Sequence, residues 1–349
     1  MHLHINPHDE APVYRQIQHQ IGRAIADREI RPGDLLDSHQ DLAVQLAVSP
    51  SAVRKAYQEL QSDGLCDESR GGDFRVTTPD LGSGHGSSTD LALSLLKREL
   101  LTRELRTARE VQHRLLPPPE VSGDSWTVTS RSYPAGALAG DFYDIVEHEN
   151  SIIDIAIADV AGKGLAAGLI MAVAKSLIPL AATQDSPGDA LGELNERLFP
   201  LLSNREFVAL AYARFDPRDG TLQIANAGLP DPYLLRHTGP VETLGVEGDR
   251  LPLGIRRGIP YFTSKFSIHP ADRLLLVTDG IPEAADPKDN PIGYEGLARL
   301  LDSSLEWAGN STTSTADQWL DRLLEQVSRR TGSMLEDDWT AVLLEYQRP

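Results

Sequence analysis

The sequence predicts an α+β protein of several domains, because helical and strand-like patterns occupy separate blocks of the 349-residue chain. Helical periodicity dominates the first block, up to residue 64. A stretch without glycine or proline follows over 90–116, which is typical of one long helix. Strand-like runs dominate the remainder. We therefore expect a first domain over 1–78, a linker and helix over 79–119, and a second domain over 120–349.

The first domain is expected to contain three helices followed by two short strands. Apolar residues recur every fourth position in the first helix, at Val13, Ile17, Ile21 and Ile25. Ser49 precedes a proline at the start of the third helix, where a serine side chain accepts hydrogen bonds from the free amides of the first turn. The expected elements span 12–27, 38–46, 49–64, 65–68 and 74–76. This order is that of a helix-turn-helix followed by a two-stranded wing.

This block resembles the GntR-type winged-helix DNA-binding domain over residues 10–78. The resemblance is carried by PVYRQI at 12–17, PGDLL at 32–36 and LAVSPSAVRKAY at 46–57. It implies a DNA-binding surface made of Ser49, Ser51, Arg54, Lys55 and Arg70. Residues 1–80 hold eight Lys and Arg against thirteen Asp and Glu, an unusual balance for a surface that neutralises phosphates. The alternative is a winged helix that serves protein contacts or signal input.

A segment rich in glycine and serine over 79–89 is expected to be a flexible linker. The helix that follows it over 90–116 carries a narrow apolar stripe that includes Leu96, Leu100 and Leu105. Such a stripe can pack on its own second domain or on the same helix of a second chain. We expect a homodimer through this helix.

The second domain is predicted to contain many antiparallel strands with helices segregated from them. Strands are expected at 126–132, 141–147, 152–160, 207–215, 222–226, 233–236, 262–268, 273–277 and 339–345. Helices are expected at 165–180, 190–198, 294–301 and 316–329. This arrangement favours two sheets flanked by helices, an α-β-β-α sandwich.

Four aspartates of the second domain stand where strand-like runs end or are interrupted: Asp141, Asp159, Asp279 and Asp337. Each alone has a simpler explanation, since aspartates are common in turns and at helix caps. Together they indicate carboxylates that converge, and like charges brought close need a cation between them. Clusters of oxygen ligands select Mg²⁺ or Mn²⁺, and two such ions can activate a water against phosphorus. The pattern therefore predicts a metal-dependent phosphohydrolase.

The second domain also resembles the SpoIIE-type, protein phosphatase 2C-like (PPM) serine/threonine phosphatases over 117–349. The motifs occur in the family's order: GDFYD at 140–144, DVAGKG at 159–164, ANAG at 225–228, LPLGI at 251–255, TDG at 278–280 and DDWT at 337–340. The resemblance implies a catalytic centre with two Mn²⁺ or Mg²⁺ ions, whose ligands would be Asp141, Asp159, Val160, Asp279, Asp337 and Asp338.

Two further features belong to this resemblance. The segment AREVQHRLLP at 108–117 resembles the helix that precedes such domains, which in that family is associated with dimerisation and control of activity. Leu229 is a departure, because the family often has histidine there. That position is no metal ligand, so the departure concerns contacts with substrate and leaves catalysis intact.

Composition fits a cytoplasmic protein. The single cysteine, Cys66, excludes an intrachain disulfide, and the N-terminus has no signal-peptide pattern. The most apolar segment, over 165–182, is interrupted by Lys175 and Pro179, which favours a buried helix over a membrane span. The net charge of −18 argues against general attraction to nucleic acid or anionic lipid. Zinc-binding and nucleotide-cofactor motifs are absent.

We therefore expect a signalling phosphatase that hydrolyses phosphoserine or phosphothreonine on a protein, with the four aspartates as its catalytic residues. The winged helix would serve regulation or DNA binding. The resemblance implies a phosphorylated anti-sigma-factor antagonist as the substrate. The alternative is a GntR-like transcription regulator whose phosphatase domain is mainly a sensor, and the complete set of aspartates argues against it.

Overall fold

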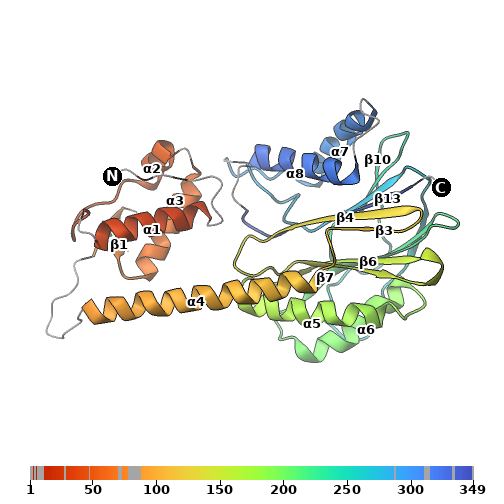
Figure 1. The fold of residues 1–349 in the computed structure, drawn as a ribbon, viewed down its shortest axis with the longest axis horizontal. Coiled ribbons are helices and arrows are strands. Elements are labelled where there is room, and N and C mark those ends of the chain that lie inside the picture. Colours follow the sequence, from red (N-terminus) through yellow and green to blue (C-terminus); the bar gives the residue numbers. More distant parts are fainter. Residues whose placement is uncertain are drawn as a thin grey trace. The chain divides into compact units, whose positions relative to one another are not determined.

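The computed structural model describes residues 3, 5, 12–26, 29–46, 48–69, 73–77, 88–286, 288–309, 315–331 and 335–347. The chain divides into two compact units, Met1–Ser94 and Leu95–Pro349, each of which has its own core (Figure 1). Arg70, the expected wing turn at 71–72 and residues 79–87 of the expected linker lie outside the described residues. We retain the division into 1–78, 79–119 and 120–349 as a proposal for the domain organisation.

The first unit combines three helices with a two-stranded antiparallel sheet. Its elements are α1 (Val13–Ala26), α2 (His39–Leu46), α3 (Pro50–Ser62), β1 (Cys66–Glu68) and β2 (Phe74–Val76). The Ser49 side chain accepts a hydrogen bond from the Ala52 N–H at 3.2 Å and so caps α3. Cys66 is buried in a core to which all three helices contribute. The predicted winged-helix order is confirmed.

One long helix, α4 (Ser88–Leu115), follows the first unit's sheet in the chain. It ends just before the prolines at 117–119, as expected from the loss of backbone donors there. Leu100, Leu101 and Val111 on this helix are exposed, whereas Gln112 is buried. The C-terminal part of α4 therefore has both a solvent-facing apolar surface and a face that packs within the second unit.

The second unit contains two antiparallel sheets. One has six strands in the order β10-β9-β12-β13-β4-β3, and the other has five in the order β11-β8-β7-β6-β5. Their strands are β3 (Glu120–Ser122), β4 (Trp126–Tyr133), β5 (Phe142–Glu147), β6 (Ile153–Val160), β7 (Val208–Asp216), β8 (Thr221–Ala227), β9 (Tyr233–Leu235), β10 (Val241–Thr243), β11 (Ser264–Ser267), β12 (Arg273–Val277) and β13 (Trp339–Tyr346). The short strands β3 and β10 were not predicted.

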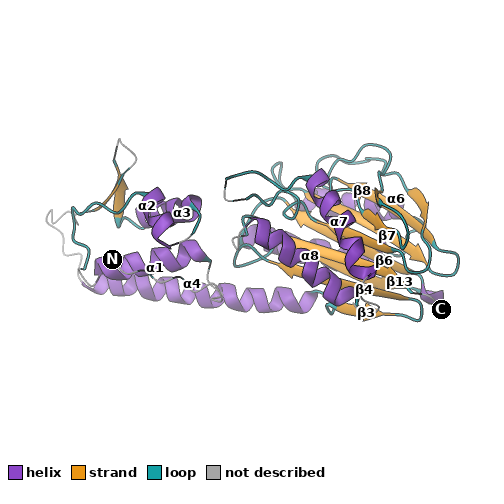
Figure 2. Cartoon of the chain, turned by 90° about the horizontal axis from the view of Figure 1, so that it is seen from above, coloured by secondary structure: helices purple, strands orange, loops and turns teal. Residues whose placement is uncertain are grey.

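Helices cover the outer face of each sheet, and the inner faces form the main core (Figure 1). In β6, Ile155 and Ile157 point toward the other sheet, whereas Ala156 and Ala158 face the helices, because side chains alternate along a strand. The covering helices are α5 (Leu165–Ala181) and α6 (Pro187–Leu198) on the five-stranded sheet, and α7 (Tyr294–Gly309) and α8 (Ala316–Thr331) on the six-stranded sheet. Figure 2 shows α7 and α8 lying over the strands. The predicted α-β-β-α sandwich is confirmed.

Among the described helices, none combines the length and the apolar character that a membrane span requires. This includes α5, the most apolar of them, which contains Lys175 and Pro179.

Candidate metal centre

The four aspartates singled out from the sequence gather at one end of the sandwich. Asp159 lies in β6, and Asp141 stands just before β5, the antiparallel neighbour of β6. Asp279 follows β12, and Asp337 precedes β13, which pairs with β12. The Thr278 hydroxyl donates a 2.7 Å hydrogen bond to Asp141 and so joins the edges of the two sheets. Strand pairing within each sheet and this contact between the sheets bring together the segments that carry the four aspartates.

Burial and mutual repulsion both disfavour the charged forms of these carboxylates. Asp141 is 1% exposed, and its pKa is raised well above its ordinary value by burial first and then by Asp159 and Asp338. Burial, followed by Asp279 and Asp337, raises the pKa of Asp159 from 3.8 to about 7. Burial and Asp337 also raise the pKa of Asp279. The group is therefore short of positive charge.

Asp338 orients the loop that carries Asp141. Its Oδ1 accepts from the Ala135 N–H and its Oδ2 from the Gly140 N–H, both at 2.7 Å. The Asp141 N–H makes a longer contact of 3.4 Å to the same Oδ2. A charged acceptor for backbone amides gives strong, directional hydrogen bonds. Asp338 therefore acts on the site through the position of Asp141, and its expected role as a direct ligand stays a prediction.

Lys163 brings a positive charge to this group. Its Nζ lies 3.1 Å from Asp337 Oδ2 and donates to the Glu336 carbonyl at 2.6 Å. The lysine stands between Gly162 and Gly164, whose φ angles of 106° and 79° favour glycine. Both side chains of the ion pair are more than half exposed, so the pair adds little to stability.

Two glycines allow the loops to approach each other closely. A Cβ at Gly140 would lie 2.9 Å from the Val160 carbonyl oxygen and 3.7 Å from Asp159 Oδ1. A Cβ at Gly280 would lie 2.1 Å from the Asp338 carbonyl oxygen. Only glycine fits at these two positions, and its use keeps a main-chain carbonyl and carboxylates within one small volume.

The residues fit a pair of hard divalent ions. The converging aspartates offer oxygen ligands, which suit Mg²⁺ and Mn²⁺, and burial and mutual repulsion disfavour the charged forms of Asp141 and Asp159 when no cation is bound. As the side chains stand in the described part of the chain, no three His, Cys, Asp or Glu residues enclose an ion position. Asp141, Asp159, Asp279 and Asp337 would thus have to move closer together around bound ions.

Gln112 of α4 braces both loops that lead into the site. Its Nε2 donates to the Ala139 carbonyl at 2.8 Å, and its Oε1 accepts from the Ala139 N–H at 3.0 Å. A longer contact of 3.4 Å joins Nε2 to the Gly168 carbonyl in the first turn of α5. Ala139 is two residues from Asp141, and α5 begins directly after the 159–164 loop. The position of α4 is therefore coupled to both halves of the candidate site.

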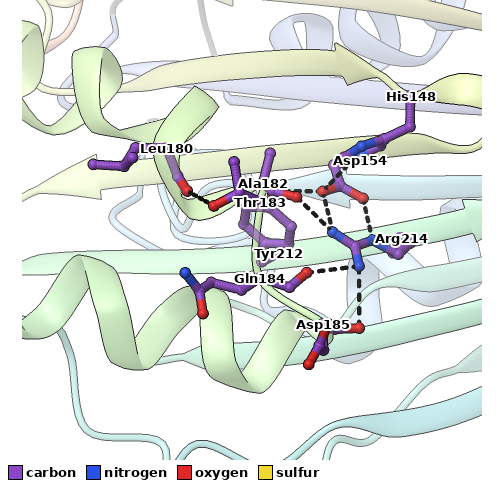
Figure 3. A network of polar contacts seen from close by, with 9 residues as sticks. All are labelled: His148, Asp154, Leu180, Ala182, Thr183, Gln184, Asp185, Tyr212 and Arg214. Atoms are coloured by element: carbon purple, nitrogen blue, oxygen red, sulfur yellow. Dashed lines mark hydrogen bonds and ion pairs between the residues drawn. The ribbon is translucent and has the colours of Figure 1, made fainter.

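Charged side chains anchor the other parts of α5 to the five-stranded sheet. Lys175 pairs with Asp144 of β5 at 3.1 Å. Arg214 of β7 contacts both oxygens of Asp154, at 2.7 and 2.8 Å, and the Tyr212 hydroxyl donates to the same carboxylate at 2.7 Å (Figure 3). The guanidinium also donates to carbonyls just after the helix: Ala182, Gln184 and Asp185. A buried charge pair with this many hydrogen bonds defines where α5 ends.

Sequence reasoning missed four residues near the site. Thr278 and Lys163 lie inside quoted motifs, but their contacts depend on the other sheet. Glu283 follows Asp279 by four residues, and its pKa is raised by burial and then by Asp279 and Asp337. Gln112 lies in the apolar stripe of its helix, and nothing in the sequence indicates that its side chain contacts the loops of the site.

Leu229, the expected departure at a substrate contact, is a core residue. It is 2% exposed and packs between the sheets. Its N–H donates to Asn226 Oδ1 at 2.9 Å, and the Asn226 amide donates back to its carbonyl at 3.0 Å. In this chain the main chain at 229 therefore closes the turn after β8, while the Leu229 side chain packs in the core.

Comparison with solved structures identifies the fold of the second unit. The chain superposes on the SiaA-PP2C domain of Pseudomonas aeruginosa with a TM-score of 0.61, at 20% identity, covering 72% of this chain and 99% of that domain. The two-sheet sandwich flanked by helices is thus the PP2C fold.

Sequence comparison assigns the family. The family model described as Stage II sporulation protein E (SpoIIE) matches residues 151–347, and the chain belongs to this family. A second family model, bacterial regulatory proteins of the gntR family, matches residues 13–76. The N-terminal unit is accordingly a GntR-type helix-turn-helix domain.

Two curated relatives reflect this fusion. The chain is 24% identical to phosphoserine phosphatase RsbU of Bacillus subtilis (strain 168) over 327 residues, which cover 93% of this chain and 90% of RsbU. It is 35% identical to the HTH-type transcriptional repressor YtrA of the same organism over 69 residues, covering 20% of this chain and 53% of YtrA.

Proposed function

We propose that this protein removes phosphate from phosphoserine or phosphothreonine of a protein substrate, in a metal-dependent reaction at the Asp141–Asp159 edge. The observation that carries the proposal is the burial of like-charged carboxylates contributed by both sheets of a PPM fold. The name of its relative RsbU supports phosphoserine as the first substrate to try. By family resemblance, the substrate would be a phosphorylated anti-sigma-factor antagonist.

Two Mn²⁺ or Mg²⁺ ions would be held by Asp141, Asp159, the Val160 carbonyl, Asp279 and Asp337, with Asp338 as a further expected ligand. When bound, such ions supply an activated water and neutralise charge on the phosphoryl oxygens. The protein's own groups keep this edge in order. Asp338 and Thr278 fix Asp141, and the tight glycine contacts hold the two loops together.

Metal removal tests the proposal directly. The purified full chain should hydrolyse a phosphoserine peptide and p-nitrophenyl phosphate in Mn²⁺ or Mg²⁺, and should lose this activity in EDTA. Re-addition of Mn²⁺ should restore it, because the bound cations would compensate the buried negative charge of these carboxylates. Absence of hydrolysis of both compounds with every divalent ion tried would contradict the proposed function.

The N-terminal unit is proposed to bind DNA through Ser49, Ser51, Arg54, Lys55 and Arg70. Ser49 is already engaged as the cap of α3, and Lys55 Nζ lies 4.3 Å from the centre of the Tyr14 ring. Arg54 is exposed. The alternative of a winged helix that serves protein contacts or signal input is kept, because few cations are available.

We expect DNA binding to be weak and salt-sensitive, with a Kd no tighter than about 1 µM at physiological salt. Fluorescence anisotropy with random and operator-selected duplexes over a salt series would measure it. Nanomolar binding to a defined duplex that Arg54→Ala abolishes would show that this expectation is wrong.

A homodimer through α4 is also proposed. Leu100, Leu101 and Val111 are exposed on the described part of the helix, with exposed fractions of 52%, 56% and 45%. Covering such side chains in a helix pair would be favourable. The residue pattern supports pairing of two copies of this helix.

A further inference from the structure

A loop that follows Leu253 lies beside the candidate metal centre. Val208, the first residue of β7, pairs with Val160 of β6 on one side and with Leu253 on the other. The two hydrogen bonds between Val208 and Leu253 measure 3.0 and 2.8 Å. Two strand spacings therefore separate Leu253 from Val160, or about 10 Å. The residues after Leu253 emerge next to the 159–164 loop.

This loop is held firmly from beneath by α6. Asn195, 1% exposed, accepts from the Gly254 N–H at 2.8 Å and donates to the Arg256 carbonyl at 2.8 Å. Glu196 accepts from the Gly258 N–H at 2.9 Å. Gly254 has a φ of 91°, and a Cβ there would lie 2.3 Å from Leu202. A buried amide that holds both sides of a loop fixes what the loop presents to solvent.

The fixed loop presents cations and apolar surface. Arg256, Arg257 and nearby Arg205 are exposed, and Ile255 and Leu201 are 49% and 61% exposed. Together these five residues are the arginine rim. The Arg257 guanidinium also lies 5.0 Å from the centre of the Phe199 ring.

The guanidinium groups of the arginine rim are available for a partner. Arg250, a few residues earlier, is paired with Asp231 at 2.9 Å, whereas the rim arginines form no ion pair with any carboxylate that the structure describes. Two acids of this region accept from main-chain amides, Glu196 from the Gly258 N–H at 2.9 Å and Glu206 from the Ser203 N–H at 2.8 Å.

We propose that the arginine rim docks an acidic segment next to the phosphorylated residue of the substrate protein. This inference rests on the proposed phosphatase function. A chain of net charge −18 with an acidic centre repels an acidic phosphoprotein, so local cations are needed to guide one to the site. Guanidinium groups bind carboxylates in a directional, two-pronged way. An extended peptide advances about 3.3 Å per residue, so side chains about three residues from the phosphoserine reach the rim.

Matched phosphoserine peptides with acidic, neutral and basic flanks test this docking. For the wild type, kcat/KM for the acidic peptide should exceed that for the neutral peptide by about tenfold. The difference should lie in KM, and it should shrink steeply as the salt concentration rises. The double variant Arg256→Glu/Arg257→Glu should prefer the basic peptide. Its hydrolysis of p-nitrophenyl phosphate should be unchanged, because that compound has no flanks. Replacement of both arginines by glutamine should give an intermediate preference.

Arg322→Glu is the matched control, since Arg322 is exposed on α8, which packs on the other sheet. It should keep the wild-type preference. A double variant that still prefers the acidic peptide, or a wild type that hydrolyses all three peptides equally well, would overturn the docking inference alone. A wild type that hydrolyses neither the phosphoserine peptides nor p-nitrophenyl phosphate would instead overturn the proposed function and the inference with it.

Discussion

Replacing Asp159 by asparagine should lower kcat for phosphate-ester hydrolysis by about a thousandfold or more. Asp159 lies in β6, and its pKa is raised by burial first and then by the nearby charges of Asp279 and Asp337 from the other sheet. Asparagine keeps the shape and one oxygen, but removes the charge that would bind a cation. The loss should therefore appear mainly as weaker activation by Mn²⁺ together with a lower kcat at saturating Mn²⁺.

The same substitution should stabilise the metal-free protein at neutral and higher pH. The pKa of Asp159 is raised in the folded chain from 3.8 to about 7, so the folded state keeps a proton that the unfolded chain releases. This stabilising contribution is complete below the unfolded pKa and is lost as pH rises through about 7. In EDTA, the wild type should thus lose thermal stability between about pH 4 and pH 7, the interval between the unfolded and folded pKa values of Asp159. Asp159→Asn should lose less.

Asp124→Asn serves as the control for both measurements, because Asp124 is an exposed aspartate in the turn before β4. It should leave activity and melting temperature unchanged. Near-normal Mn²⁺-dependent turnover in Asp159→Asn would remove this residue from the metal centre. If the melting temperatures of Asp159→Asn and the wild type depended on pH in the same way, the pKa of Asp159 would not be raised by its surroundings.

The aspartates at this end of the sandwich could be predicted from the sequence, because the motifs that contain them are short and local. Asp141 and Asp279 lie next to a glycine, and Asp159 lies three residues before Gly162. Each stands at one end of an apolar strand, and such a pattern is visible without the fold. The layer order follows from the same signals, since alternating strands and amphipathic helices fix which faces are buried. Short edge strands such as β10 are too brief and too polar to show periodicity.

The supporting contacts could not be predicted, because they join residues far apart in the chain. Asp338 accepts from the Gly140 N–H across 198 positions, and Gln112 reaches Ala139 and Gly168 across 27 and 56. The sequence does not distinguish the roles of two adjacent acidic residues such as Asp337 and Asp338. In the structure, one of the two holds backbone amides while the other pairs with an exposed lysine.

Gln112→Leu should reduce turnover by about tenfold or more while leaving the protein folded. Leucine has a similar size, but it leaves the N–H and carbonyl of Ala139 without their partners, each at a cost of about 1–3 kcal/mol. The segment leading to Asp141 and the first turn of α5 would then lose their common brace. Because substrate groups are not touched, the change should fall on kcat and on the Mn²⁺ requirement, with KM for p-nitrophenyl phosphate little affected.

His113→Leu is the matched control, since His113 is exposed on the same turn of α4 and should tolerate leucine without loss of turnover. Leu105→Glu separates the brace from dimer formation. If α4 acts by pairing with a second copy, this charge should shift the sedimentation coefficient toward the monomer and lower turnover as well. If the brace within one chain is sufficient, Leu105→Glu should alter sedimentation alone. Wild-type turnover in Gln112→Leu would mean that α4 is a spacer, because its buried contact with both loops would then have no effect on the site.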